Sequence, residues 1–238
     1  MSLPIIAITT SAMTSPRSGR ENGRYYIERD YVDRVIAAGG APILIPPGAD
    51  VASIAPLIDG WVIPGGGDFD SEMWGEELHP EAQPEFKDRT DTEVELFRSI
   101  SPEAPILGIC YGCQLVNILQ GGTIHQHIPD QLGHDGHRGD PVQDYRVEAG
   151  TKLHNMVGDS AQGKSWHHQA VNRVGDGLKE VAWHEDGTVE AIESTEGRWF
   201  VGLQWHPERT EVDESARIFD AFIQAVIEAK KSKIGVGA

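Results

Sequence analysis

Both cysteines of the chain lie in the segment APILGICYGCQLVNILQGG (residues 104–122). The first of them, Cys110, has one glycine two positions before it and another two positions after it, Gly108 and Gly112. This pattern is typical of a sharp turn from a strand into a helix, where a nucleophile has a strained backbone and larger flanking residues would collide. The turn exposes the sulfur at a helix N-terminus, where the helix dipole favours the thiolate. The segment therefore predicts a cysteine nucleophile.

The same cysteines allow other interpretations. A redox-active Cys-x-x-Cys pair also lies between a strand and a helix, but it does not need flanking glycines. A structural zinc site normally takes four ligands, and the chain has no second cysteine pair. Cys110 could also be buried as a small apolar side chain. We interpret Cys113, one helical turn further on, as a packing residue that could trap Cys110 under oxidation.

A cysteine nucleophile needs a general base, and the segment GLQWHPE (residues 202–208) contains a histidine. The apolar run predicts a buried strand that ends at Pro207, because proline cannot donate to a strand ladder. His206 and Glu208 would face the same side if the extended backbone continued. Glu208 could then hold one imidazole nitrogen while the other faces the sulfur. The alternative is a histidine beside a turn proline with a solvated glutamate, which is the commoner case for these three residues alone.

The elements that position these residues alternate along the first half of the chain. Short apolar runs predict strands over residues 4–9, 41–47, 60–67 and 104–109. Helical patterns predict helices over residues 25–40, 51–58, 88–100 and 113–120. The second half predicts strands over residues 145–149, 178–194 and 199–205, with a hairpin turn at Asp186-Gly187, and an amphipathic helix over residues 214–231. We therefore predict an α/β sandwich with a mostly parallel central sheet and an antiparallel addition at one edge.

Composition limits the partners and the compartment. The formal net charge of −17 disfavours binding to nucleic acid or to anionic lipid. No apolar run is long enough to cross a bilayer, and the N-terminus lacks the pattern of a secretion signal. Two cysteines cannot form a disulfide scaffold in 238 residues, so we expect a reducing cytoplasm. The expected partner is a small molecule, and the sequence leaves a homo-oligomer open.

The segments GICYGCQ and QWHPE together resemble the class I glutamine amidotransferase domain. Further segments resemble the peptidase C26 family, especially its γ-glutamyl-γ-aminobutyrate hydrolases: YVDRVIAAGGAPILIPP, PGGGDFD, GEELHP, GCQLVNILQGGTIHQHI and HHQAV. The resemblance covers nearly the whole chain, and it implies one class I glutamine amidotransferase-like domain over residues 1–238 with a flavodoxin-like three-layer fold. It also implies a cysteine hydrolase that cleaves the γ-glutamyl amide bond of small γ-glutamyl compounds through a γ-glutamyl thioester, without a cofactor. A glutaminase subunit that supplies ammonia to a separate synthetase is the alternative.

The resemblance assigns roles residue by residue. The implied triad is Cys110 as nucleophile, His206 as acid and base, and Glu208 as the residue that orients His206. The implied oxyanion hole consists of backbone N–H groups of Gly65 or Gly66 and of Tyr111, since a glycine run at a strand end lets bare amides approach a negative oxygen. The residues implied to bind substrate are Gln114, His168 and Gln169.

Two features outside these motifs need an interpretation. The histidines at positions 125, 127, 134 and 137 could be read as a metal site, but no carboxylate or cysteine pattern completes a ligand set, so we expect no metal. The segment of residues 11–24 is expected to lie over the active site, because loops at the carboxyl ends of parallel strands form the crevice. Its arginines could meet a substrate carboxylate, although solvated charge is the simpler interpretation: Arg17, Arg20 and Arg24.

Overall fold

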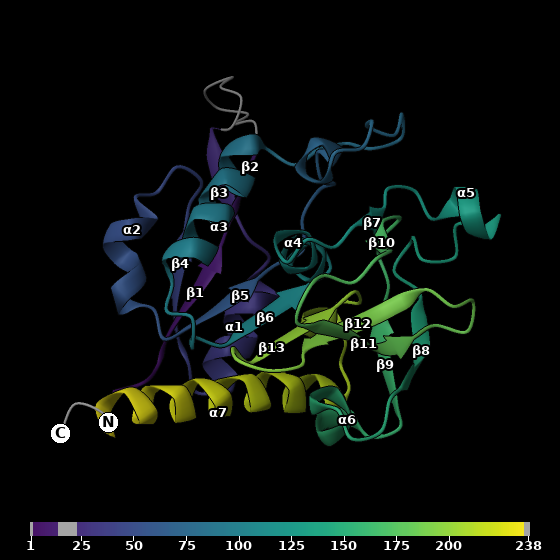
Figure 1. Cartoon of the computed structure of the whole chain (residues 1–238). Coiled ribbons are helices and arrows are strands. Elements are labelled where there is room, and N and C mark those ends of the chain that lie inside the picture. The colour runs from purple at the N-terminus through teal and green to yellow at the C-terminus, as the bar shows by residue number, and fades with distance from the viewer. Residues whose placement is uncertain (1, 14–22, 236–238) are drawn as a thin grey trace.

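The computed structural model describes residues 2–13 and 23–235. Within these ranges an 11-stranded sheet runs through the molecule in the order β4-β1-β5-β6-β13-β12-β11-β8-β9, with β10 paired to β12 and β7 paired to β10 (Figure 1). The strands of this sheet are β1 (Ile5–Thr9), β4 (Ala41–Ile45), β5 (Gly60–Ile63), β6 (Ile106–Ile109), β7 (Ile124–His125), β8 (Val142–Val147), β9 (Ser160–Lys164), β10 (Ala170–Val171), β11 (Leu178–Trp183), β12 (Val189–Ser194) and β13 (Phe200–Leu203). A separate hairpin pairs β2 (Ser11–Met13) with β3 (Arg24–Tyr26).

The parallel half of the sheet brings the chemically interesting segments to one edge. Strands β4, β1, β5, β6 and β13 are parallel neighbours, and Gly108 of β6 lies opposite both Ile63 of β5 and Gly202 of β13. Because parallel strands end at the same edge, the residues that follow β5, β6 and β13 lie side by side there. The glycine run, Cys110 and His206 are therefore neighbours, although they are far apart in the sequence.

Helices cover both faces of the sheet. The helices in the described ranges are α1 (Arg29–Ala37), α2 (Val51–Ile54), α3 (Lys87–Ser99), α4 (Tyr111–Leu119), α5 (Pro129–Leu132), α6 (Lys152–Val157) and α7 (Asp213–Gly235), with short 3-10 helices η1 (Ala55–Leu57), η2 (Ser71–Trp74) and η3 (Pro207–Arg209); of these, α5 buries no residue. Helices α1, α6 and α7 pack into one apolar core, while α2, α3 and α4 pack into the other (Figure 1). Along β1, Ile6 and Ile8 face the first core and Ala7 faces the second, as alternation in a strand requires. The predicted three-layer α/β sandwich is confirmed.

The antiparallel half departs from the sequence prediction in extent. Strands β12, β11, β8 and β9 form a broad antiparallel extension in which Asp186-Gly187 turns between β11 and β12 as predicted. Strand β9 and helix α6 were not predicted, and the pair β7–β10 was missed because each strand is only two residues long. No helix within the described ranges is long and apolar enough to cross a membrane.

The helix predicted over residues 25–40 begins too early. Its first residues belong to β3, where Tyr25 pairs with Ala12, and the helix α1 starts only at Arg29. Tyr31 and Val35 are the buried members of the apolar pattern that suggested the helix. A tertiary strand pairing therefore overrides the local helical pattern at its first turn.

Candidate active site

Cys110 lies at the turn between β6 and α4 and has a strained backbone. Its φ of 51° and ψ of −103° are unusual for a residue with a side chain. A Cβ atom at Gly108 would lie 2.6 Å from the Gly112 carbonyl oxygen, and one at Gly112 would overlap the carbonyl of Ile63. Both glycines are therefore required by the close approach of β5, β6 and α4. The turn presents the sulfur at the first residue before a helix.

His206 and Glu208 form a buried pair beside this turn. The His206 Nδ1 atom is 2.7 Å from Glu208 Oε1, and the two residues are 8% and 3% exposed. The sequence prediction placed both side chains on the same side by assuming an extended backbone. The structure differs, because the backbone leaves the extended conformation after the strand. Pro207–Arg209 form η3, and this short helical turn directs the carboxylate to the ring.

The ionisation of His206 reflects its neighbours. Burial by itself would lower the pKa of the ring, but the charge of Glu208 and hydrogen bonds to Cys110 and Glu208 outweigh it and raise the pKa to about 10. A Cβ atom at Gly65 would lie 2.9 Å from His206 Cε1 and 3.8 Å from Cys110 Cβ. The thiol, the imidazole and the glycine run thus meet at one point.

Two further groups contact the sulfur. Gln204 is fully buried, and its Nε2 atom donates a hydrogen bond to Cys110 Sγ at 3.4 Å. Cys110 Sγ lies 3.9 Å from the carbonyl oxygen of Trp166, to which it can donate weakly. Gln204 received no role from the sequence, although it belongs to the QWHPE segment. Its donor supports a negative charge on the sulfur.

In the glycine run, the N–H of Gly66 has no hydrogen-bond partner among the described residues, whereas the N–H of Gly67 donates to Glu85 at 3.2 Å. The N–H of Gly65 already donates to the Tyr31 hydroxyl at 3.0 Å. Arg89 donates to the carbonyls of Pro64 and Gly65, each at 3.1 Å. Because a trans peptide points its C=O and N–H in opposite directions, the bond to Gly65 O turns the Gly66 N–H away from Arg89. Gly66 is therefore the better donor of the two predicted positions.

Arg89 fixes this geometry from inside the protein. Its side chain is 2% exposed and forms ion pairs with Glu85 at 2.9 Å and Glu93 at 3.1 Å. Its guanidinium also lies 4.3 Å from the ring centroid of Tyr111, whose ring stacks on Phe69. Arg89 was missed from the sequence, because a charge in a polar helix pattern looks like solvated surface. Only its distant partners identify it as a buried support for the glycine run.

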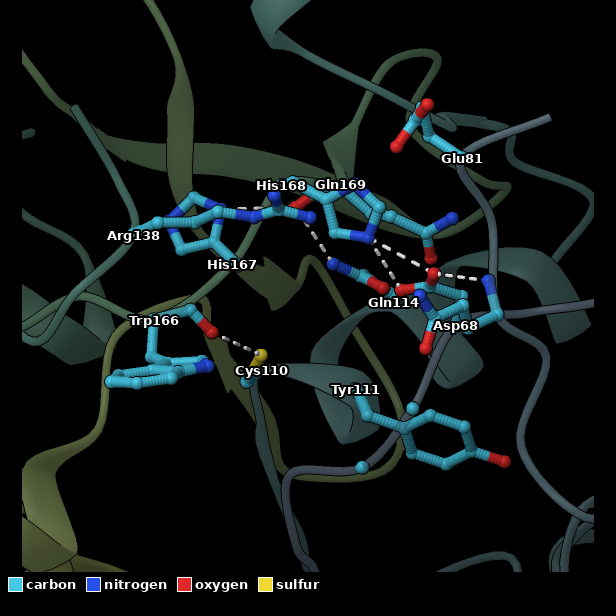
Figure 2. Close-up of a pocket in the computed structure, with 13 residues that line it drawn as sticks. Asp68, Glu81, Cys110, Tyr111, Gln114, Arg138, Trp166, His167, His168 and Gln169 are labelled. Atoms are coloured by element: carbon cyan, nitrogen blue, oxygen red, sulfur yellow. Dashed lines mark hydrogen bonds and ion pairs between the residues drawn. The ribbon is translucent and has the colours of Figure 1, made fainter. Parts of the chain in front are cut away.

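Two recesses meet at Cys110. The first has a volume of about 420 Å³, and Figure 2 shows Arg138 on one side of it and Asp68 and Glu81 on the other. The second has a volume of about 440 Å³ and runs toward β3 and η3. Cys110, Gly66 and Trp166 line both recesses, so a substrate that fills both would span the sulfur.

The residues predicted to bind substrate line the first recess. Gln114 donates through Nε2 to the Gln169 carbonyl at 3.0 Å and to Gln204 Oε1 at 2.9 Å, which leaves its own Oε1 without a partner among the described residues. His168 Nε2 lies 2.8 Å from Asp68 Oδ1. The side chain of Gln169 is tied down by backbone groups at both ends. The geometry thus makes Gln114 the candidate with a free acceptor.

Other residues considered from the sequence lie elsewhere. Cys113 is 1% exposed and belongs to the core on the opposite face from Cys110, where burial raises the pKa of its thiol. Both thiols are free. Arg24 is exposed on β3, whereas Arg17 and Arg20 lie outside the described residues. Of the described residues in the segment 11–24, Ser11 lines the second recess.

The four histidines that could be read as a metal site do not share one centre. His125 contacts Gln131, and His127 contacts His168. His134 and His137 instead both lie near Asp186, at 3.6 Å and 2.8 Å, on the antiparallel side of the sheet. No shared centre of these four side chains is present within residues 2–13 and 23–235.

Comparisons with known proteins agree with this arrangement. The family model of peptidase C26 matches residues 4–208. A Mycobacterium tuberculosis protein provisionally named a glutamine amidotransferase is 38% identical over 212 residues, which cover 84% of this chain and 67% of that protein. The γ-glutamyl-γ-aminobutyrate hydrolase of Escherichia coli O157:H7 is 30% identical over 220 residues, covering 84% and 85%.

A solved structure shares the fold at low sequence similarity. A Thermoplasma acidophilum protein, described as one of the subunits of GMP synthase, superposes with a TM-score of 0.72 at 15% identity, covering 98% of each chain. Together with the family match over residues 4–208, the elbow at Cys110 and the His206–Glu208 pair, these similarities lead to one conclusion. The chain is a member of the peptidase C26 family, within the class I glutamine amidotransferase-like superfamily.

Proposed function

We propose that the protein is a cysteine hydrolase that cleaves the γ-glutamyl amide bond of small γ-glutamyl compounds. The observation that carries this proposal is the strained Cys110 beside the His206–Glu208 pair, at the junction of two recesses. The relatives named γ-glutamyl-γ-aminobutyrate hydrolase support the substrate class. Such an enzyme would work in the reducing cytoplasm, where its thiol stays reduced.

In the first half of the reaction, Cys110 Sγ bonds to the γ-carbonyl carbon, and the carbonyl oxygen becomes an oxyanion. The N–H groups of Gly66 and Tyr111 donate to this oxygen, and one such donor contributes about 3 kcal/mol to the barrier reduction. His206 gives its proton to the amine nitrogen, and the C–N bond breaks. The amine leaves, and a γ-glutamyl thioester remains on Cys110.

In the second half, a water molecule attacks the thioester carbon. His206 takes one proton from the water, and the new C–O bond replaces the C–S bond. Glutamate leaves and Cys110 returns as a thiolate. Glu208 holds the Nδ1 side of the ring throughout and stabilises its positive charge.

The first recess suits the glutamyl group. Its free amino acid end carries an ammonium and a carboxylate, so it needs an acidic wall and a basic wall. Asp68 and Glu81 supply the acidic side, and Arg138 lies on the opposite side (Figure 2). Gln114 Oε1 adds an acceptor for the ammonium. The recess thus favours a γ-glutamyl compound over an amide that lacks the amino acid end.

The second recess suits the leaving amine. Tyr26, Ile27 and Trp166 give it apolar walls, and Arg209 adds a positive charge at the side of η3. Arg209 is 28% exposed and already lies 3.4 Å from Asp140. An aliphatic amine with a distal carboxylate, such as γ-aminobutyrate, has both features.

The second candidate function is a glutaminase that supplies ammonia to a separate synthetase. The name of the Mycobacterium tuberculosis relative favours it. The two candidate functions differ in the amine that is released when the thioester forms. A glutaminase releases ammonia, which is too small to need the second recess. A partner chain would also be needed for full turnover.

The test measures free glutamate from γ-glutamyl-γ-aminobutyrate, from other γ-glutamyl amides and from glutamine. We expect the purified chain to hydrolyse the larger amides with higher kcat/KM than glutamine. Cys110→Ala should lower kcat by about 10⁴-fold or more, whereas Cys113→Ala should keep it within about threefold. Turnover of glutamine alone, and only with an added partner, would establish the glutaminase instead. Reversible formation of a Cys110–Cys113 disulfide without turnover would indicate a redox role.

A further inference from the structure

A second cluster of polar side chains lies buried beside the first recess, and one of its members, His167, also lines that recess. His137 is 1% exposed, His167 5% and Glu190 0%. The Glu190 Oε1 atom is 3.4 Å from His137 Nδ1 and 3.5 Å from His167 Nε2. Three potential ligand atoms from three separate segments of the chain thus lie within 4.8 Å of one another.

The surroundings of the two rings define which nitrogens carry protons. The Nδ1 atom of His167 is 3.0 Å from the carbonyl oxygen of Gln169, which can only accept, so the ring proton is on Nδ1. The Nε2 atom of His137 is 2.8 Å from Asp186 Oδ2, so the proton of that ring is on Nε2. The lone pairs of His167 Nε2 and His137 Nδ1 therefore both face Glu190. The Ser165 hydroxyl also lies 3.5 Å from His137 Nδ1, but it donates to the backbone carbonyl of His137 at 3.1 Å.

Three acceptors consequently point at one another in a buried place. Neither oxygen of Glu190 nor the Nε2 atom of His167 has a hydrogen-bond partner among the described residues. Buried carboxylates and ring nitrogens are almost always satisfied by a donor or a cation. A hydrogen-bond donor or a cation therefore belongs between these atoms.

We propose that His137, His167 and Glu190 bind a divalent transition metal ion, with zinc as the best fit. Tetrahedral zinc with bonds of about 2.0–2.2 Å keeps its ligand atoms about 3.4 Å apart. The two separations from Glu190 match this spacing. Two imidazoles and one carboxylate suit zinc or cobalt, whereas magnesium and calcium prefer oxygen ligands. A water molecule or the second oxygen of Glu190 completes the coordination.

Neighbouring residues support the ligands in the way metal sites need. Asp186 accepts from the outer nitrogen of His137 and so fixes its tautomer, as carboxylates commonly do behind a metal-bound histidine. The Gln169 carbonyl does the same for His167. His184 lies 3.1 Å from Asp186 and closes the outer side of the cluster.

The position of the site gives the metal a structural role. His167 itself lines the first recess, together with His168 and Gln169. Glu190 belongs to β12 in the antiparallel extension. The ion would therefore join the wall of the glutamyl recess to the extended sheet. It lies outside the Cys110–His206–Glu208 group, so this proposal does not depend on the proposed hydrolysis.

The test is a Co²⁺ titration of the full chain carrying Cys110→Ser, after treatment with a chelator. The substitution removes the thiol at the catalytic site as a competing ligand. We expect one equivalent of Co²⁺ to give the visible absorption of a four-coordinate ion, and zinc to displace it. The unfolding temperature should rise with the concentration of either metal, because only the folded chain presents the three ligands together.

A matched pair of variants locates the metal. His137→Gln should weaken Co²⁺ binding by about 10²-fold or more. His154→Gln should leave it unchanged, since His154 also contacts a carboxylate, Asp159, but does so at the surface. If His137→Gln does not fold, X-ray absorption of the zinc-loaded parent decides, with nitrogen and oxygen but no sulfur ligands expected.

Two results would overturn the proposal. Absence of Co²⁺ absorption and of any metal-dependent unfolding temperature would mean that a proton, not a metal, lies between the acceptors. Burial raises the pKa of Glu190 to about 8, which is the condition for that alternative. Binding that persists undiminished in His137→Gln would place the ion elsewhere.

Discussion

His206 carries its proton over an unusual range of pH because Glu208 lies against its ring. The folded-state pKa of about 10 exceeds the value of about 6.5 expected in the unfolded chain. The stabilisation from this proton is complete below about pH 6.5 and is lost as the pH rises toward 10. The free energy of unfolding should therefore fall by up to about 1.4 kcal/mol per pH unit between pH 7 and 10. Urea denaturation at successive pH values measures this slope.

The matched variant for this measurement is His206→Gln, which removes the titrating ring and keeps a polar side chain. The difference between the two curves should thus shrink as the pH rises. Parallel curves for parent and variant would show that Glu208 does not hold a protonated ring.

Local sequence motifs were enough to predict the candidate catalytic residues. The residues that hold the glycine run in place could not be predicted in this way. Cys110, His206 and Glu208 each lie within a few residues of a glycine or proline that marks a strand end, so short segments were enough. Tyr31 and Arg89 come from helices α1 and α3 and act through backbone groups of the glycine run. The spacing of residues along the chain does not predict such contacts, because they depend on how the helices pack against the sheet.

At the level of elements, the crossing of β5, β6 and α4 leaves no room for a side chain at Gly112. Gly112→Ala should lower the free energy of unfolding by about 2 kcal/mol or more and reduce kcat, because the Cβ atom would push against the backbone of Ile63. Urea denaturation and steady-state kinetics measure both effects. Gly48→Ala is the control, since its φ of +77° costs about 1 kcal/mol but open space surrounds it. A full loss of activity in Gly48→Ala would show that the elbow is not specially sensitive.

Helix α3 supports the glycine run through one buried guanidinium. Arg89→Lys keeps the positive charge beside Glu85 and Glu93 but loses the fork that donates to two carbonyls. We expect kcat to fall by about 10- to 100-fold with little change in KM, because the oxyanion donor would no longer be held in place. Arg98→Lys, exposed near the end of the same helix, should leave both constants unchanged. An equal rise in KM with kcat preserved would instead assign Arg89 to substrate binding.

The elements themselves were predictable where one local signal dominates. The apolar runs of the parallel strands and the Asp186-Gly187 turn identified β1, β4, β5, β6, β11 and β12. The start of α1 was wrong because β3 takes the first residues of its pattern into a hairpin with β2. The pairing of β7 with β10 joins segments about 45 residues apart, so neither short strand has a signal of its own. A single sequence does not show which strands pair when they are far apart along the chain.

At the scale of the whole molecule, the formal charge of −17 acts on every charged ligand. The compound γ-glutamyl-γ-aminobutyrate has two carboxylates and one ammonium, so it approaches the protein as an anion. Glutamine, with one carboxylate and one ammonium, has no net charge. Long-range repulsion should therefore slow productive binding of the first compound and leave the second unaffected. Under the proposed function, contacts with Arg138 and Arg209 would act only after the substrate has entered.

Salt separates the long-range effect from the contacts. Raising KCl from about 0.02 M to about 0.2 M shortens the Debye length from about 20 Å to about 7 Å. We expect kcat/KM for the anionic substrate to rise about two- to fivefold, because the distant negative charges are screened while the recess keeps its own charges. The kcat/KM for a neutral γ-glutamyl amide should stay constant, and choline chloride should act like KCl. A fall in kcat/KM with increasing salt would mean that the local arginines, rather than the overall charge, control the encounter. The recesses would then attract the anionic substrate despite the negative charge of the whole molecule.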